Sequence, residues 1–104
     1  TGSPMREFLH VDDLGKAVLY ALENRLEEHL YNVGTGIDLT IKELAELIQS
    51  IVGHKGEIVW DSSKPDGTPR KLMDNSKIQN QGWTAEIKLK NGVSKVDNWF
   101  KDNY

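Results

Sequence analysis

Residues 40–53 constrain the fold most, because they specify a helix with both ends marked. Thr40 and Glu43 match a capping box, in which the threonine side chain accepts the N–H of the third helical residue and the glutamate reaches back. Gly53 stands where the C-terminus of a helix favours glycine. One apolar stripe lies between these two ends, formed by Ile41, Leu44, Ala45, Ile48, Ile51 and Val52. The pattern predicts an amphipathic helix that begins after Thr40 and ends at Gly53.

The rest of the chain mixes predicted helices with short extended segments. Apolar spacing predicts further helices over about 12–25 and about 89–102, with a short one from residue 74 or 75 through 78. Alternating and apolar runs predict extended segments over 6–11, 29–33 and 57–60. Asp12 and Asp13 are expected to cap the first helix. The sequence therefore predicts one domain over residues 1–104, of the mixed α/β (α+β) class.

Size, charge and composition exclude several kinds of protein. The 104 residues suit one small domain, and 38% hydrophobic residues allow a packed core. A net charge of −3, from 13 basic and 16 acidic side chains, argues against a general nucleic-acid binder. No apolar run approaches the roughly 20 residues of a membrane span. Without cysteine, the chain forms neither disulfides nor cysteine zinc sites.

A basic, proline-containing loop is the strongest candidate for a binding site. Residues 61–70 hold two prolines and a glycine, which together favour a shaped turn. Lys64, Arg70 and Lys71 place three cationic groups within eight positions. Arginine offers a planar fork to phosphate oxygens and lysine a mobile point charge, so the loop suits an anion such as a pyrophosphate. The alternative is a solvated loop with ordinary surface charges.

Arg6 and His10 are the other side chains that such a site would use. Arg6 follows a turn and precedes an extended apolar segment, so it is placed to point into a cleft. The alternative is a surface arginine paired with Glu7 or an aspartate. His10 has a suitable pKa range for acid–base chemistry, but no partner is visible, and a buried, hydrogen-bonded histidine is the favoured interpretation.

The glycines at 34 and 36 do not form a dinucleotide-binding fingerprint. The third glycine of G-x-G-x-x-G would fall at Leu39, and the order of elements does not match. The segment Gly34-Thr35-Gly36 is therefore predicted to be a structural turn. His29 and His54 are isolated in the sequence and do not form part of a pattern that resembles a metal site.

Two segments resemble the extended short-chain dehydrogenase/reductase family that acts on nucleotide sugars. Residues 6–13, Arg-Glu-Phe-Leu-His-Val-Asp-Asp, indicate the family as a whole. Residues 61–74, Asp-Ser-Ser-Lys-Pro-Asp-Gly-Thr-Pro-Arg-Lys-Leu-Met-Asp, narrow it, because they closely resemble the GDP-L-fucose synthases. Residues 31–36, the capping box and Gly82-Trp83 fall in the expected order, so the resemblance covers nearly the whole chain.

The resemblance implies an activity and a substrate site. GDP-L-fucose synthases epimerise GDP-4-keto-6-deoxy-mannose and reduce it with NADPH to GDP-L-fucose, and the full-length enzymes are expected to be cytoplasmic homodimers. Arg6 matches an arginine that contacts the substrate, and Lys71 matches a lysine near the diphosphate. Arg70 lies beside Lys71 and is a further substrate-binding candidate. Glu57 stands where the family often has a basic residue, which puts one nucleotide contact in doubt.

The resemblance also implies that the catalytic part lies elsewhere. The family carries an N-terminal glycine-rich phosphate turn, a Tyr-x-x-x-Lys pair, and a cysteine and histidine for epimerisation. Neither Tyr20 nor Tyr31 has a lysine four positions later. The chain opens at Thr1, and its first methionine is Met5. We therefore expect a C-terminal substrate-binding part without its Rossmann core, with no catalytic, cofactor or metal residues, that does not bind NADPH and is inactive alone.

Three hypotheses for the function follow from this resemblance. The first is this substrate-binding part, with segment 11–36 packing on the absent nucleotide-binding domain. The second is the lid of another nucleotide-sugar epimerase or reductase. The third is a stand-alone nucleotide-sugar-binding module. For all three the expected ligand is a nucleotide sugar, with no nucleic acid and no membrane as partner.

Overall fold

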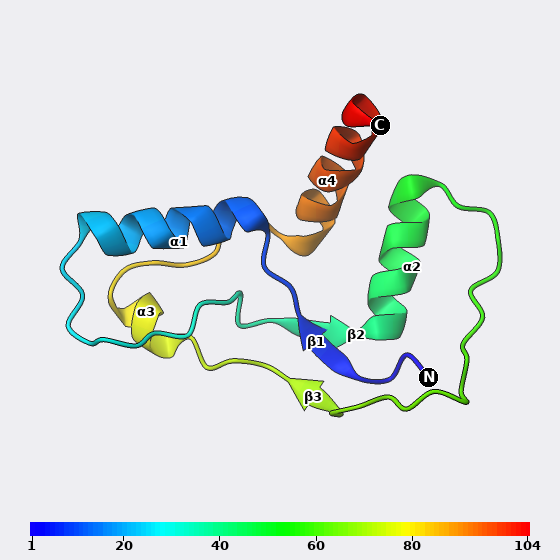
Figure 1. The fold of residues 1–104 in the computed structure, drawn as a ribbon, viewed down its shortest axis with the longest axis horizontal. Helices are drawn as coiled ribbons and strands as arrows, with labels where there is room; N and C mark the ends of the chain where they lie inside the picture. The colour runs from blue at the N-terminus through cyan, green and yellow to red at the C-terminus, as the bar shows by residue number, and fades with distance from the viewer.

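The computed structural model describes residues 1–104 as four helices around a small sheet (Figure 1). In chain order the elements are β1 (Met5–Glu7), α1 (Val11–Glu23), β2 (Asp38–Thr40), α2 (Ile41–Val52), β3 (Arg70–Lys71), α3 (Ser76–Asn80) and α4 (Leu89–Asn103). The mixed α/β class is confirmed, and the four predicted helices are present with boundaries within two residues of those expected. None of the helices is long and apolar enough to cross a membrane.

The sheet is built around β1, which has a strand on each side. Its order is β2-β1-β3, with β2 antiparallel and β3 parallel to β1. Arg6 is paired with Leu39 on one side and with Lys71 on the other. The β1–β3 ladder contains only one more pair, Met5 with Arg70. The short sheet therefore joins the start of the chain to the end of the basic loop.

The expected strands over 29–33 and 57–60 are wrong, since neither segment pairs with another strand. Side-chain contacts hold both segments instead. Val33 packs against the hydrophobic core. The Trp60 ring covers Gly2, where an added Cβ would lie 2.8 Å from the ring. The apolar side chains that suggested strands contribute to packing, and the backbone of these two segments pairs with no other strand.

Both ends of α2 are as the sequence predicts. The Thr40 hydroxyl accepts the N–H of Glu43 at 3.0 Å, and the Glu43 carboxylate accepts the N–H of Thr40 at 2.8 Å. Gly53 adopts a left-handed conformation with φ of 74°. The segment before β1 adds a contact that the sequence did not show, because Pro4 O accepts the N–H of Ile41 at 3.0 Å. The capped helix is thereby fixed to the start of β1.

The prediction that Asp12 and Asp13 cap α1 is wrong. His10 is the N-cap, and its Nδ1 accepts the N–H of Asp12 at 3.0 Å. Asp13 is 1% exposed, and one of its oxygens accepts the N–H groups of Glu86 and Ile87 at 3.1 and 2.9 Å. The Asp13 carboxylate therefore binds a distant backbone segment, and it ties the start of α1 to the residues that lead into α4.

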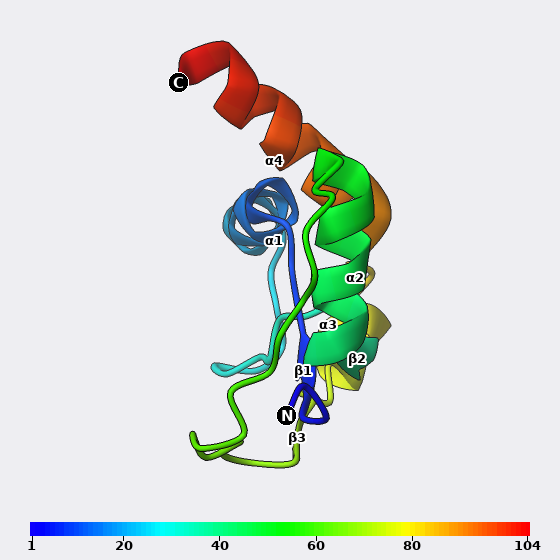
Figure 2. The ribbon, with the colours of Figure 1, turned by 90° about the vertical axis from the view of Figure 1, so that its right-hand side faces the viewer.

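The molecule is flat, and its core is small. Its extents are 49 × 35 × 17 Å, and its radius of gyration of 16.3 Å exceeds the roughly 13 Å of a compact chain of this length (Figure 2). The buried hydrophobic side chains are Ala17, Ile78 and Trp83, where α1, α3 and the following turn meet. Many larger apolar side chains of α1 and α4 stay exposed, among them Val11, Val18, Leu22, Val96, Trp99 and Phe100.

An apolar groove lies where α2 faces α4. It has a volume of about 560 Å³ and is lined by Leu44, Ile48 and Val52 from α2 and by Val93, Val96 and Phe100 from α4. The apolar stripe predicted for residues 41–52 is thus only partly covered in this chain.

Candidate functional site

The structure brings Arg6 and Lys71 together on adjacent strands. They are direct partners in the parallel β1–β3 ladder, so their side chains leave the same face of the sheet. The half-buried Arg6 donates from Nη1 to the carbonyl of Met5 at 2.7 Å. Lys71 is exposed and forms no ion pair. Two cationic groups from segments 65 residues apart (71 − 6) therefore share one surface.

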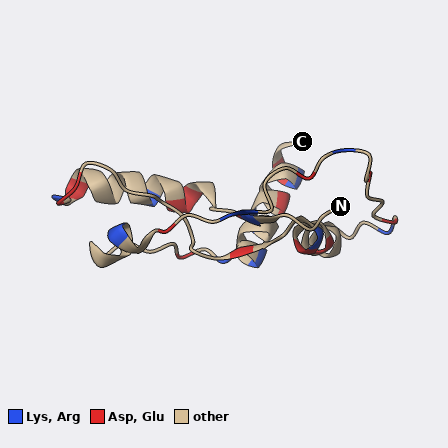
Figure 3. Cartoon of the chain, turned by 90° about the horizontal axis from the view of Figure 1, so that it is seen from below, with Lys and Arg blue, Asp and Glu red and all other residues tan.

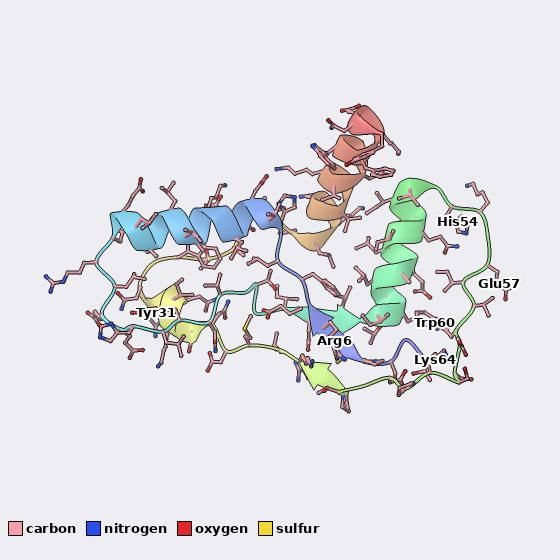
Figure 4. The ribbon with its side chains drawn as sticks, viewed as in Figure 1. Arg6, Tyr31, His54, Glu57, Trp60 and Lys64 are labelled. Carbon is pink, nitrogen blue, oxygen red and sulfur yellow. The ribbon has the colours of Figure 1, made fainter.

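The basic loop folds back toward Arg6. An added Cβ on Gly67 would lie 3.9 Å from Nη2 of Arg6, so the backbone passes close to the guanidinium. Gly67 has φ of 77°, a conformation that side chains other than glycine rarely adopt. Lys64, in contrast, lies on the outer part of the loop, apart from Arg6 (Figure 4). The site thus combines Arg6 and Lys71 with the loop backbone.

The loop's first turn is fixed by Asp61. Its carboxylate accepts the N–H and the hydroxyl of Ser63 at 3.0 and 2.5 Å, and these hydrogen bonds lower the pKa of Asp61. Lys64 N–H donates to the Asp61 carbonyl at 3.2 Å. The structure therefore bears out a shaped turn at the start of this loop.

Arg70 lies on the opposite face from the Arg6–Lys71 pair. It pairs with Met5 in the ladder, and its guanidinium binds the Asp38 carboxylate at 2.6 and 3.3 Å. These two hydrogen bonds raise the pKa of Arg70 further above its usual value. The side chain of Asp38 is almost buried. The fork of Arg70 is occupied by a partner within the chain, which links β3 across β1 to β2.

Glu7 organises the same region, and the sequence did not single it out. Its carboxylate accepts the N–H of Gly36 at 2.6 Å and the N–H of Met73 at 3.4 Å. An added Cβ on Gly34 would lie only 2.6 Å from a Glu7 oxygen. The glycine turn 34–36 is therefore structural, as predicted, and its small residues make room for this carboxylate. The signal in the sequence that could have pointed to Glu7 was an acidic residue next to a basic one in a predicted extended segment, together with a Gly-x-Gly segment far along the chain.

The remaining candidates have structural surroundings. The His10 side chain is 10% exposed and hydrogen-bonded through Nδ1, which confirms the favoured interpretation for this residue. His54 and Glu57 lie along the outer connection between α2 and the basic loop (Figure 4). Basic and acidic residues are interspersed over the chain (Figure 3). The Arg6–Lys71 pair is thus a local feature on a surface of mixed charge.

Comparison with known proteins shows that the chain is similar to part of several enzymes that act on nucleotide sugars. Residues 1–34 match the model of the NAD dependent epimerase/dehydratase family. A probable GDP-L-fucose synthase of Oryza sativa subsp. japonica is 55% identical over 103 residues, which cover 99% of this chain and 31% of that protein. The chain therefore spans about a third of the length of the curated relatives it matches.

Solved structures agree with the sequence comparison. A GDP-6-OMe-4-keto-L-xylo-heptose reductase from C. jejuni matches with a TM-score of 0.92 and 39% identity, over 100% of this chain and 33% of that one. A GDP-L-fucose synthetase from Naegleria fowleri bound to NADP matches with a TM-score of 0.93 and 25% identity, again over 100% and 33%. Over the residues it contains, the chain is therefore similar to GDP-L-fucose synthases and to a reductase of a GDP-linked sugar.

Proposed function

We propose that this chain is the C-terminal, substrate-binding part of an enzyme like GDP-L-fucose synthase. The whole enzyme would epimerise GDP-4-keto-6-deoxy-mannose and reduce it with NADPH to GDP-L-fucose, and would act as a homodimer. One structural observation carries the proposal: Arg6 and Lys71, the two residues that match the family's substrate contacts, are partners in one ladder and share one face. The identity of 55% over nearly the whole chain supports the same conclusion.

Arg6 and Lys71 would bind the diphosphate of the substrate. A guanidinium donates two parallel hydrogen bonds to phosphate oxygens, and an ammonium adds a mobile point charge. Gly67 and its neighbours would close the site beside Arg6, because their backbone already lies next to the guanidinium. We assign Arg70 an indirect role instead of the substrate contact expected from the sequence, because Asp38 occupies its guanidinium. It would hold β3 in place.

The cofactor and the catalytic groups would belong to the remaining part of the enzyme. The glycine turn 34–36 leads into strand β2 and its Gly36 N–H donates to Glu7, so the turn does not offer the helix N-terminus that a dinucleotide phosphate requires. NADPH, when bound elsewhere, would supply the hydride. Segment 11–36 would pack against that part, since the apolar side chains Val11, Val18 and Leu22 of α1 are exposed here.

If the cofactor and the catalytic groups belong to the remaining part of the enzyme, this chain alone should produce no turnover. Incubation with NADPH and the 4-keto sugar should leave the absorbance of NADPH at 340 nm unchanged, while an enzyme that joins the chain to its Rossmann part should consume the cofactor. A turnover rate from the chain alone that scales with its concentration would contradict the proposal. It would favour a chain that carries its own catalytic groups.

Replacing either cation should weaken binding of the GDP sugar. Lys71→Ala and Arg6→Ala each remove a charge-assisted phosphate contact, which costs about 1.5–3 kcal/mol, or roughly a 10- to 100-fold loss of affinity. Isothermal titration calorimetry of the intact enzyme with GDP measures this directly. Lys16→Ala is the matched control, because Lys16 pairs with Glu86 on the surface of α1. Unchanged affinity in both variants would mean that Arg6 and Lys71 do not bind substrate.

The choice of nucleotide separates this proposal from the alternative of another nucleotide-sugar epimerase or reductase. Competition among GDP, UDP and dTDP sugars on the intact enzyme should favour the guanosine nucleotide. Preference for UDP or dTDP would reject the specificity proposed here and leave the diphosphate contacts intact.

A further inference from the structure

We propose that Glu7 is a positioning residue, whose carboxylate keeps Lys71 beside Arg6. This inference rests on the proposed function, since it concerns the same anion site. Glu7 follows Arg6 in β1 and points to the opposite face of the sheet, so it does not touch a ligand bound by the two cations. It would act through the backbone segments that flank the site.

The first of these segments is the glycine turn. The N–H of Gly36 donates to Glu7 Oε2 at 2.6 Å, a short and charge-assisted contact. The buried Asn75 holds the same turn from its other side, because its Nδ2 donates to the carbonyl of Gly34 at 2.7 Å. Since Gly34 lacks a side chain, the carboxylate can lie against its backbone. The turn is thus locked onto β1 just before it enters β2.

The second segment follows β3 and bears directly on Lys71. Two residue pairs alone form the β1–β3 ladder, so the ladder needs support at its ends. On one side the Arg70–Asp38 ion pair crosses to β2, and Met5 N–H donates to the carbonyl of Pro69 at 2.8 Å. On the other side Met73 N–H lies 3.4 Å from Glu7 Oε1. Lys71 therefore sits between two anchored points.

The site needs such anchors because its two functional groups repel each other. Like charges at directly opposed positions of neighbouring strands destabilise the pairing. Until an anion binds, repulsion between Arg6 and Lys71 favours separation of β3 from β1. Glu7 opposes that separation through its hydrogen bond to the N–H of Met73 on the far face, and so preserves a preformed site for an anion.

Glu7→Gln tests the inference because positioning and electrostatics predict opposite signs. The glutamine amide keeps one acceptor oxygen but presents an NH₂ donor to the second backbone N–H group, so β3 should loosen. The affinity of the intact enzyme for GDP should then fall about 10-fold, which lies within the interaction energies of residues in contact. If Glu7 acted only through its negative charge, its removal would instead tighten anion binding. Gly34→Ala is the second variant, since it displaces the carboxylate and keeps the charge. It should weaken binding in the same direction.

A double-mutant cycle with Lys71→Ala completes the test. If Glu7 works by placing Lys71, then Glu7→Gln should change GDP affinity less than about 2-fold once Lys71 is absent. Additive losses, unchanged affinity or tighter binding in the single variant would overturn the inference. Lys71→Ala without any effect would instead overturn the proposed phosphate contact of Lys71, and the inference with it. Glu28→Gln, which removes an exposed carboxylate paired with Lys77 at 2.8 Å, is the control and should bind GDP normally.

Discussion

Replacing Ile78 with alanine should lower the free energy of unfolding by about 2–5 kcal/mol. Ile78 is 2% exposed and lies in contact with Ala17 and Trp83, the only other buried hydrophobic side chains. Truncation removes apolar surface from the core and leaves a cavity between α1 and α3, which such a thin molecule has few atoms to refill. Urea unfolding followed by tryptophan fluorescence reports the change, because the indole of Trp83 lines the same cluster.

Ile37→Ala is the matched control for this experiment. Ile37 is 75% exposed, so the same truncation removes few packing contacts and should change stability by less than about 0.5 kcal/mol. Equal losses in the two variants would show that the cluster around Ile78 is not the core. Because whole domains are stable by only about 5–15 kcal/mol, a loss of the expected size would leave a substantial unfolded population of a chain with so small a core.

Asp13→Ala should destabilise the protein by about 2–4 kcal/mol, because it strips two backbone N–H groups of their only acceptor. The carboxylate of Asp13 accepts the amides of Glu86 and Ile87, and these bonds fix the approach to α4 against α1. Thermal unfolding by circular dichroism should show a lower midpoint. Hydrogen exchange of the two amides should accelerate at the same time.

Its neighbour supplies the control for Asp13. Asp12 is exposed and forms no strong contact, so Asp12→Ala should cost less than about 1 kcal/mol, the usual value of a charge in the first turn of a helix. Asp13→Asn keeps an acceptor oxygen and should lose less stability than Asp13→Ala. If the alanine variants at 12 and 13 were equally stable, the contact across to α4 would contribute nothing.

Local patterns predicted the helices well and the strands poorly. The capping box at Thr40 and the glycine at 53 act within a few residues, so the sequence alone determined both ends of α2. The strand β3 has no recognisable pattern, since Arg70 and Lys71 are exposed and basic. It exists because Met5 and Arg6 lie beside it, a pairing that depends on the whole loop path.

The residues of the candidate site remain a prediction, and the sequence alone did not indicate their arrangement. The resemblance suggested Arg6 and Lys71 as substrate contacts, and only the ladder register showed that these two residues share a face. The sequence also grouped Arg70 with Lys71, although adjacent residues of a strand point to opposite faces. The role of Glu7 depends on amides 29 and 66 residues away, which no local spacing reveals.

The central place of β1 also determines the order in which the chain can assemble. During synthesis β1 is made before both of its neighbours, since its partners at Thr40 and Arg70 come later in the chain. At about 5–20 residues per second, the interval between Met5 and Arg70 is roughly 3–13 s. Once β1 has left the ribosome, and until β3 is made, the edge of β1 that faces β3 is open to other extended chains.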